Sequence, residues 1–336
     1  MNTKLILAGA LLMAGAASAQ KVNTQKAGNG IYELVYNEAD NSVYVASTGS
    51  RTKPGSFLYQ LDGSTLAVKD SIALTDTPPF GLGLNKKTQT VYSTNTRSNS
   101  VSAIDVKSKK VLATIKPDSD KSHTREAAIN EKTNKIYISD VGRPSKIWVI
   151  DGKTQKVEKI IENTGVTTTG MVIDEAADKL YATNMGTNVI VVIDLKSAAV
   201  VDSFATGGES SVNLALDKAN NRLFVVNQKS NDVSVVDLKT RSVVKTLPAG
   251  KGALGIAIDE KRNRVYTANR GDGTVTVIDT KTLTVLDNIK TGGTYPNTVA
   301  VNKKDGSIYV TNKAQGKREE PTYVDPNGDV VTHIKF

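Results

Sequence analysis

Short apolar and β-branched runs alternate with polar turns along most of the chain. In residues 253–289, strand-like segments run from Ala253 to Ile258, Arg264 to Ala268, Thr274 to Ile278 and Thr284 to Ile289, separated by polar turns. Val, Ile, Thr and Tyr suit a pleated surface, whereas Asn, Asp and Gly favour turns. The pattern predicts four consecutive β-strands. The absence of a sustained 3.6-residue period predicts that helix is nearly absent.

This unit recurs along the chain, marked by a tetrapeptide that begins with an aromatic residue. Successive copies begin 42 to 48 residues apart, and they are Tyr44-Val45-Ala46-Ser47, Tyr92-Ser93-Thr94-Asn95, Tyr137-Ile138-Ser139-Asp140, Tyr181-Ala182-Thr183-Asn184, Phe224-Val225-Val226-Asn227, Tyr266-Thr267-Ala268-Asn269 and Tyr309-Val310-Thr311-Asn312. A hydrophobic-Asp pair recurs in phase with them: Leu61-Asp62, Ile104-Asp105, Ile150-Asp151, Ile193-Asp194, Val236-Asp237 and Ile278-Asp279. Four strands per repeat of about 40–50 residues predict an all-β fold, a single-domain seven-bladed β-propeller of four-stranded blades. A β-solenoid is the alternative, but its coils are usually shorter and do not need three polar turns per repeat.

The first strand of each unit is apolar on both faces. When the units are aligned on the polar residue that ends this strand, the position two residues earlier is mostly small: Val35, Gly83, Ala128, Val172, Ala215, Ala257 and Ala300. The next position is mostly large: Tyr36, Leu84, Ile129, Ile173, Leu216, Ile258 and Val301. Small side chains on one face and large ones on the other allow wedge-shaped blades to close around an axis at high packing density.

The N-terminus has the pattern of a secretory signal peptide. Lys4 precedes an apolar run from Leu5 to Ala17, and Ala17-Ser18-Ala19 provides the small residues that signal peptidase accepts. We expect cleavage after Ala19 and export to the periplasm, which leaves residues 20–336 as the propeller. A signal anchor is the alternative, although the run is shorter than the ~20 residues that span a bilayer. No later segment is apolar over such a length, so we expect no transmembrane segment.

Composition permits a polyanionic partner without selecting one. The formal charge is +9, and it falls by one when Lys4 is removed. A basic chain can bind nucleic acid, an anionic glycan or a membrane surface. The basic residues expected on the face opposite the channel mouth are interleaved with acids, which weakens the case for nucleic acid. They are Lys107, Lys109, Lys110, Arg262 and Arg264.

The tetrapeptide, the hydrophobic-Asp pair and the Asp-x-Lys-[Ser/Thr] turn that follows it resemble those of the YVTN family of β-propellers. The similarity is closer still to the periplasmic YncE-like proteins of Gram-negative bacteria, and it extends over residues 21–336. The more specific stretches are Tyr32-Glu33, Asn41-Ser42-Val43-Tyr44, Pro79-Phe80-Gly81, Thr88-Gln89-Thr90, Arg125-Glu126, Ile147-Trp148-Val149-Ile150-Asp151-Gly152, and Asn163-Thr164-Gly165 running to Thr169-Gly170. The resemblance implies a non-catalytic periplasmic propeller of seven blades, with DNA binding as the one associated activity. No DNA-contact motif is present onto which specific residues could be transferred.

The start of each inner strand is the best candidate for a ligand site, because it lies at the mouth of the channel and varies from blade to blade. Five residues before the alignment position stand Tyr32, Phe80, Arg125, Thr169, Val212, Leu254 and Asn297, and four before it stand Glu33, Gly81, Glu126, Gly170, Asn213, Gly255 and Thr298. The predicted ligand-binding residues are Tyr32, Glu33, Phe80, Arg125, Glu126, Thr169, Asn213 and Asn297. Tyr32 and Phe80 with Arg125 would form an aromatic and cationic mouth suited to stacking and to an anion. The same residues would serve equally well to fill the channel.

Basic loops in the first and last units become neighbours when the ring closes. We define the basic ledge as Arg51, Lys53, Lys313, Lys317 and Arg318, and we expect it on the channel-mouth face. The alternative is that these loops are merely solvated. From the aromatic and cationic mouth and the basic ledge, we predict that the protein binds single-stranded DNA or another polyanion. A protein partner is the alternative. We expect the protein to be a monomer.

Enzymatic chemistry finds little support in the residue types. The chain has two histidines, His123 and His333, and no cysteine, so it lacks the ligands for a three-histidine metal site or a haem attachment site. No Gly-x-Ser-x-Gly elbow and no phosphate-binding Gly loop occurs. We therefore expect no catalytic residues, no metal and no cofactor. A calcium-dependent lactonase-like hydrolase, which would use carboxylates and amides at the channel mouth, is the alternative.

Two further expectations concern the turns of the repeat and the strands at the two chain ends. The Asp-x-Lys-[Ser/Thr] turns at Asp105, Asp151, Asp194, Asp237 and Asp279 are expected to be Asx turns, and the Asn that ends most tetrapeptides to be a turn residue. Both termini contain strand-like segments. We expect Val330 to Phe336 to form the outer strand of the last blade, with Val22 to Lys26 lying alongside it or near it.

Overall fold

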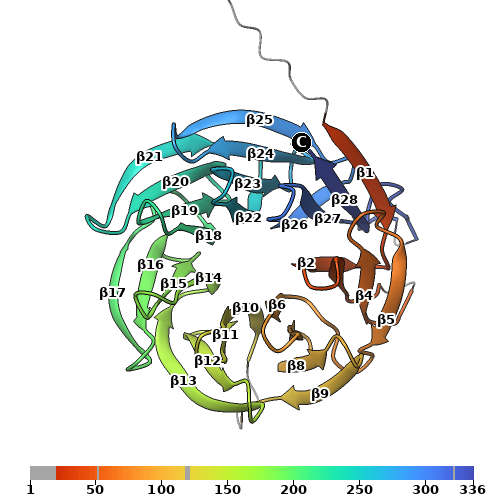
Figure 1. The fold of residues 1–336 in the computed structure, drawn as a ribbon, viewed down its shortest axis with the longest axis horizontal. Coiled ribbons are helices and arrows are strands. Elements are labelled where there is room, and N and C mark those ends of the chain that lie inside the picture. The colour runs from red at the N-terminus through yellow and green to blue at the C-terminus, as the bar shows by residue number, and fades with distance from the viewer. Residues whose placement is uncertain (1–19, 51–52, 118–121, 321) are drawn as a thin grey trace, which may run out of the picture.

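The computed structural model describes residues 20–50, 53–117, 122–320 and 322–336. Over these residues the chain forms seven four-stranded antiparallel sheets around a central channel, without helix (Figure 1). This confirms the predicted seven-bladed β-propeller. The predicted signal peptide lies outside the described residues. Among those described, no helix is long and apolar enough to cross a membrane.

Each blade runs from an inner strand at the channel to an outer strand at the rim. Blades one to three consist of β2 (Ile31–Asn37), β3 (Ser42–Ser47), β4 (Phe57–Asp62) and β5 (Val68–Ala73); β6 (Leu82–Asn85), β7 (Thr90–Asn95), β8 (Ser100–Asp105) and β9 (Lys110–Ile115); and β10 (Thr124–Asn130), β11 (Lys135–Asp140), β12 (Ser145–Asp151) and β13 (Lys156–Gly165). Blades four to six consist of β14 (Thr168–Asp174), β15 (Lys179–Asn184), β16 (Val189–Asp194) and β17 (Ala199–Ala205); β18 (Ser211–Asp217), β19 (Arg222–Asn227), β20 (Asp232–Asp237) and β21 (Ser242–Pro248); and β22 (Ala253–Asp259), β23 (Arg264–Asn269), β24 (Thr274–Asp279) and β25 (Thr284–Lys290).

The last blade is completed by the N-terminus. Its strands are β26 (Tyr295–Val301), β27 (Ile308–Lys313), β28 (Val330–Lys335) and β1 (Lys21–Lys26), in order from the channel outward. The expectation that Val330 to Phe336 would be the outer strand is therefore wrong, because β28 is the third strand and β1 pairs along its outer edge (Figure 1). The C-terminal unit supplies only three strands, so the N-terminal strand fills the fourth place and joins the two chain ends.

Asp329, which directly precedes β28, holds this closure together. Its side chain accepts hydrogen bonds from the backbone N–H groups of Gly30 (2.9 Å), Ile31 (3.1 Å) and Ala314 (3.3 Å). Its own carbonyl accepts a further bond from the N–H of Ala27 (3.1 Å). One buried carboxylate thus binds the start of blade one to both sides of the loop that enters β28.

The hydrophobic core lies between the blades. Seven buried clusters each combine side chains from two adjacent blades; one, for example, brings Tyr137 of blade three against Leu180 and Ile193 of blade four. The aromatic residue that opens each tetrapeptide is buried in such a cluster. Tyr309 closes the ring by packing in the last cluster with Leu61 of blade one. Apolar contact between neighbours therefore stabilises every blade, because a single sheet cannot bury both of its faces.

The hydrophobic-Asp turns are Asx turns, as predicted. Asp237 shows the geometry: its Oδ1 accepts hydrogen bonds from the N–H groups of Lys239 (2.8 Å) and Thr240 (2.7 Å). The same pair of bonds occurs at Asp105, Asp151, Asp194 and Asp279. These bonds favour the ionised carboxylate and lower the pKa of Asp237. The turns are structural elements of the repeat.

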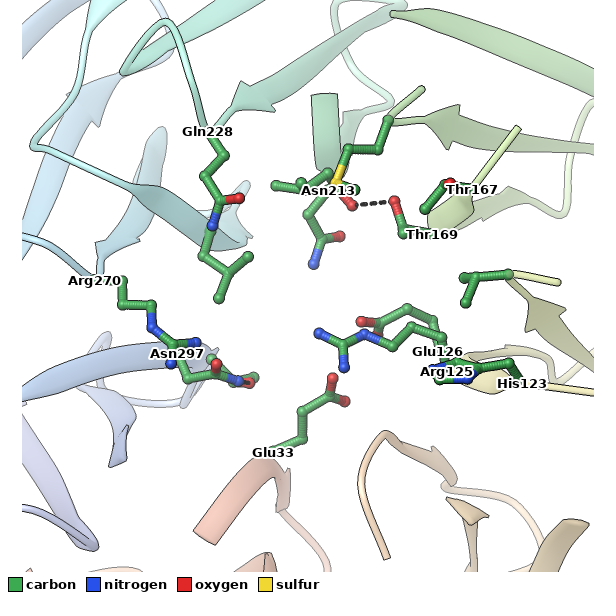
Figure 2. A pocket seen from close by; sticks show the side chains of 15 residues that line it. Glu33, His123, Arg125, Glu126, Thr167, Thr169, Asn213, Gln228, Arg270 and Asn297 are labelled. Carbon is green, nitrogen blue, oxygen red and sulfur yellow. Dashed lines mark hydrogen bonds between the residues drawn. The ribbon is translucent and has the colours of Figure 1, made fainter. Parts of the chain in front are cut away.

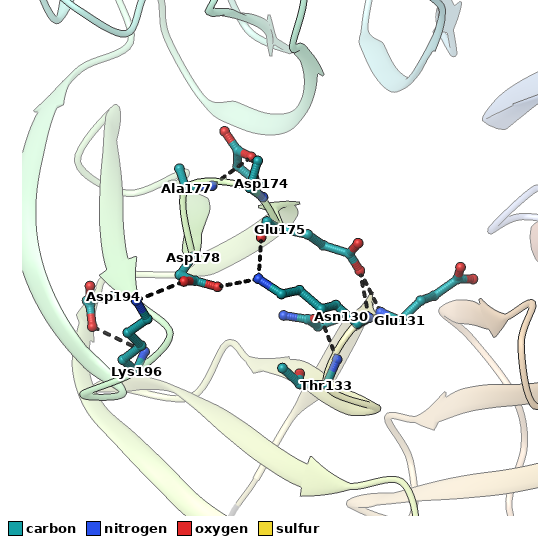
Figure 3. Close-up of polar contacts among 11 residues, drawn as sticks. Asn130, Glu131, Thr133, Asp174, Glu175, Ala177, Asp178, Asp194 and Lys196 are labelled. Atoms are coloured by element: carbon teal, nitrogen blue, oxygen red, sulfur yellow. Dashed lines mark hydrogen bonds and ion pairs between the residues drawn. The ribbon is translucent and has the colours of Figure 1, made fainter.

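Hydrogen bonds and an ion pair join neighbouring blades on the face opposite the channel mouth. The Glu175 carboxylate accepts hydrogen bonds from the backbone N–H groups of Glu131 (2.6 Å) and Lys132 (3.1 Å) in the preceding blade. The Lys132 ammonium lies near Asp178, which also pairs with Lys196 (Figure 3). These contacts join blade three to blade four on this face.

The asparagines of the tetrapeptide end their strands, but they are fully buried and bind several partners. Asn227 Nδ2 donates to Asp232 Oδ1 (2.6 Å) and Ser234 Oγ (2.8 Å), and its Oδ1 accepts from Ser211 Oγ (2.6 Å). The side chain thereby connects the inner three strands of its blade. These residues are internal clamps as well as strand ends.

We expect Asn227→Ala to lower the free energy of unfolding by about 1–3 kcal/mol, because Asp232 and Ser234 lose a buried partner. Urea unfolding would measure the change. Lys229→Ala, in the same connection, removes only an exposed ion pair with Glu209 and should stay within about 0.5 kcal/mol. Equal effects of the two substitutions would contradict the clamp.

Candidate functional site at the channel mouth

The inner strands are interrupted by β-bulges where they meet the channel mouth. The pairing of β2 with β3 shifts between Ile31 and Leu34, and that of β10 with β11 shifts between Thr124 and Ala127. β14, β18, β22 and β26 shift at the equivalent place. A bulge re-aims side chains that regular alternation would send to opposite faces. Neighbours such as Arg125 and Glu126 can therefore line the same space.

The third residue of the tetrapeptide supports these bulges in several blades. The hydroxyl of Ser139 accepts a hydrogen bond from the N–H of Glu126 (3.0 Å), and that of Thr311 accepts from the N–H of Thr298 (3.1 Å). In blade two, where β6 pairs regularly, Thr94 Oγ1 accepts from the N–H of Gly81 (2.8 Å), directly before β6. A Cβ on Gly81 would lie 2.1 Å from the Arg125 carbonyl oxygen, so glycine permits the close approach of the next blade there. The repeat motif thus shapes the mouth.

A cavity of about 270 Å³ opens between these bulges. Figure 2 shows side chains from several blades converging on it. Its lining includes six of the eight predicted ligand-binding residues, namely Glu33, Arg125, Glu126, Thr169, Asn213 and Asn297. The other two, Tyr32 and Phe80, lie outside the lining and contact each other edge-on, with their ring centroids 5.2 Å apart. The structure brings the predicted residues together; their role in binding stays a prediction.

Glu33 and Glu126 are two carboxyl groups that line this cavity. Glu33 is buried, and its Oε2 accepts a hydrogen bond from the N–H of Leu82 (2.9 Å). Burial raises the pKa of Glu33 well above its usual range, and the negative charge of Glu126 raises it further. Burial also raises the pKa of Glu126, although Arg125 opposes this shift. Burial therefore favours the protonated form of both carboxyl groups, and the two groups titrate as a pair.

Cations lie over aromatic rings around the mouth. The guanidinium of Arg125 lies 4.8 Å from the centre of the Tyr32 ring, and Lys313 Nζ lies 3.7 Å from it. Arg97 lies over Phe80 (5.3 Å) and Arg270 over Tyr295 (5.0 Å). Across the described residues none of these four cations forms an ion pair with a carboxylate. Basic side chains are therefore concentrated around the mouth, although the charge of Arg125 still interacts with the nearby carboxyl groups of Glu126 and Glu33.

The basic ledge is only partly assembled. Lys53 and Lys313 line a second hollow of about 260 Å³, together with Lys26 and Tyr323. Lys317 instead lies over the Tyr323 ring (4.1 Å) and 3.4 Å from the Glu320 carboxylate. Arg51 lies outside the described residues, and Arg318 is not part of the lining of this hollow.

Sequence reasoning missed several residues that line the cavity. The missed residues each directly follow a tetrapeptide, and they are Val141, Met185, Gln228 and Arg270. Lys313, which was predicted as part of the basic ledge, occupies the same position in the last unit and lines the second hollow. That position begins the connection between the second and third strands, which opens on the mouth face. The change of residue type from repeat to repeat immediately after the motif was the signal that could have identified them.

The two histidines occupy different environments. His123 lines the mouth cavity. His333 lies in β28, stacked on Tyr309 with ring centroids 4.5 Å apart, and burial lowers its pKa to about 4. No group of three or more His, Asp or Glu side chains suited to a metal ion occurs in the described part of the chain.

Comparison with known proteins agrees with the fold. The chain is 36% identical over 198 residues to a protein of Salmonella typhi named "Uncharacterized protein YncE", and 35% identical over 199 residues to its namesake in Escherichia coli strain K12. Each match covers 56% of this chain and 56% of the relative. The family model of YncE-like β-propellers matches residues 17–260. The chain therefore belongs to the YncE-like β-propeller family.

Proposed function

We propose that this protein is a non-enzymatic binding propeller of the periplasm, and that its channel-mouth face binds single-stranded DNA or another polyanion. The observation that carries the proposal is the set of Arg and Lys side chains over Tyr32, Phe80 and Tyr295, none of which forms a close ion pair with a carboxylate in the described structure. Aromatic faces stack on bases, and nearby cations pair with phosphates. The opposite face suits this role less well, because acids are interleaved there, as in the pairs Arg262–Asp259 and Arg264–Asp279.

The calcium-dependent hydrolase alternative fits the mouth less well. Glu33, Glu126 and Asn213 do lie in one cavity, as that alternative requires. Arg125 and Arg270 line the same cavity, however, and their positive charge opposes a divalent cation. A protein partner at this face stays a prediction, as does the monomeric state.

Binding should depend on both salt and pH. Fluorescence anisotropy with a labelled short oligothymidylate would measure affinity over a range of salt concentrations, and Arg97→Gln should reduce the slope of log K against log salt by about 1. Burial and the charges of Arg270 and Arg125 lower the pKa of Lys313 to about 7. Lys313 is therefore charged below pH 7 and neutral above it, so we expect tighter binding at pH 6 than at pH 8.

Two variants distinguish binding at the channel mouth from nonspecific attraction to basic residues elsewhere on the surface. Lys313→Met should reduce the difference between pH 6 and pH 8, whereas Lys107→Gln on the opposite face should leave affinity and salt slope unchanged. Absence of binding at low salt, where a basic site is least screened, would refute the nucleic-acid proposal.

A further inference from the structure

Asn297 carries an unpaired acceptor in the wall of the mouth cavity. Its side chain is 4% exposed, and its Nδ2 donates to the Tyr32 carbonyl oxygen (3.1 Å) and to Thr298 Oγ1 (3.3 Å). The Tyr32 carbonyl can only accept, so this bond fixes the orientation of the amide. Asn297 Oδ1 is then buried without a partner among the described residues. A buried acceptor of this kind calls for a donor from outside the chain.

The charges around the cavity call for an anion. Arg125 and Arg270 both line it, and neither guanidinium is neutralised by an ion pair with a described carboxylate. Glu33 and Glu126 line the same cavity, and burial raises the pKa of both carboxyl groups. Whenever one of these carboxyl groups is protonated, the charge of the two arginines exceeds the remaining negative charge, and the cavity can accept an anion. Arginine suits a carboxylate partner because its fork of donors matches the two oxygens.

The remaining lining limits the size and shape of the ligand. Val212, Leu254 and Met185 provide an apolar wall, and Asn213 and Gln228 add further amides. The volume of about 270 Å³ lies just below the usual range of small-molecule sites, about 300–1,000 Å³. A molecule of the size of a monosaccharide or an amino acid fits such a space.

We propose that the mouth cavity binds a small organic anion, a carboxylate that also carries hydroxyl or amino donors. Its carboxylate pairs with Arg125 and Arg270, and a donor group satisfies Asn297 Oδ1 and Glu126. This inference goes beyond nucleic-acid binding and does not depend on it. The two proposals share Arg125 and Arg270, but the oligonucleotide proposal also uses Phe80 and Arg97 outside the cavity lining, whereas the small anion occupies the interior.

Isothermal titration calorimetry with four probes tests the proposal. D-Glucuronate supplies a carboxylate with hydroxyl donors, and L-glutamate supplies net negative charge with an amino donor. Hexanoate has the charge without the donors, and D-glucose has the donors without the charge. We expect glucuronate or glutamate to bind at least tenfold more tightly than both hexanoate and glucose, and the stronger of the two identifies the donor.

Variants locate the site. Arg270→Gln should weaken the preferred acid at least tenfold, and Arg270→Lys should retain part of the affinity. Arg97→Gln is the matched control, because this exposed arginine lies over Phe80 outside the cavity lining and should leave the affinity unchanged. The proposal is overturned if neither acid binds at millimolar concentration, if hexanoate or glucose binds as well, or if Arg97→Gln weakens binding as much as Arg270→Gln. Loss of oligonucleotide binding alone, in Phe80→Ala, would leave the small-anion site intact.

Discussion

Asp329→Ala is expected to lower the free energy of unfolding by at least about 1–3 kcal/mol, because one buried and two partly buried backbone N–H groups lose their acceptor. The groups belong to Gly30, Ile31 and Ala314, which lie on the two sides of the ring closure. Equilibrium urea unfolding would measure the loss. The expected loss of stability is large because Asp329 lies where the N-terminal strand and the last blade are joined.

Two further substitutions make this test specific. Asp329→Asn keeps one acceptor oxygen in the same place and should cost less than the alanine variant. Asp287→Ala, on the exposed outer strand of blade six, should stay within about 0.5 kcal/mol. A change at Asp329→Ala as small as the one at Asp287 would show that the closure does not depend on this carboxylate.

Glu33→Gln is expected to stabilise the protein at neutral and alkaline pH. The native state binds the Glu33 proton more tightly than the unfolded state, because burial and the charge of Glu126 raise its pKa in the fold. Between the unfolded and folded pKa values the native state therefore holds more protons, and stability falls as pH rises through this window. Glutamine is neutral and can still accept from Leu82 N–H, so the penalty disappears. Each unit of pKa shift corresponds to about 1.4 kcal/mol.

Urea midpoints measured from pH 5 to pH 9 would test this prediction. The wild type should lose stability over this range relative to Glu33→Gln. The control is Glu209→Gln, because the exposed Glu209 pairs with Lys229, its pKa is lowered, and no such gain is expected. Parallel pH profiles for the wild type and Glu33→Gln would mean that Glu33 ionises normally in the fold.

Local patterns predicted the repeating parts of the molecule closely. The four strands expected in residues 253–289 begin at the observed residues and each extends one residue further. The Asx turns were also predicted correctly, because the bonds that define them join the Asp carboxylate to backbone N–H groups two and three positions ahead. Such features depend on contacts within a few residues, so they can be read without knowledge of the fold.

The candidate site was predicted in outline. The variable start of the inner strands identified Glu33, Arg125 and Asn297, which the cavity does bring together. Arg270 was missed because it follows a strand of another blade, and its place beside the cavity depends on the closed ring. The bulges were missed as well, since a shift in strand pairing leaves no mark in a single repeat.

By itself, the sequence determined the repeat, the four-stranded unit and the number of blades, because apolar alternation and turn chemistry act over short separations. Only the tertiary structure decided how the ring closes, with β1 outside β28, and which side chains share the mouth cavity. Both depend on contacts between residues far apart in the chain, such as Asp329 with Gly30. The raised pKa of Glu33 belongs to the same class. It arises from burial and from a neighbour two blades away, and neither is visible in the local pattern.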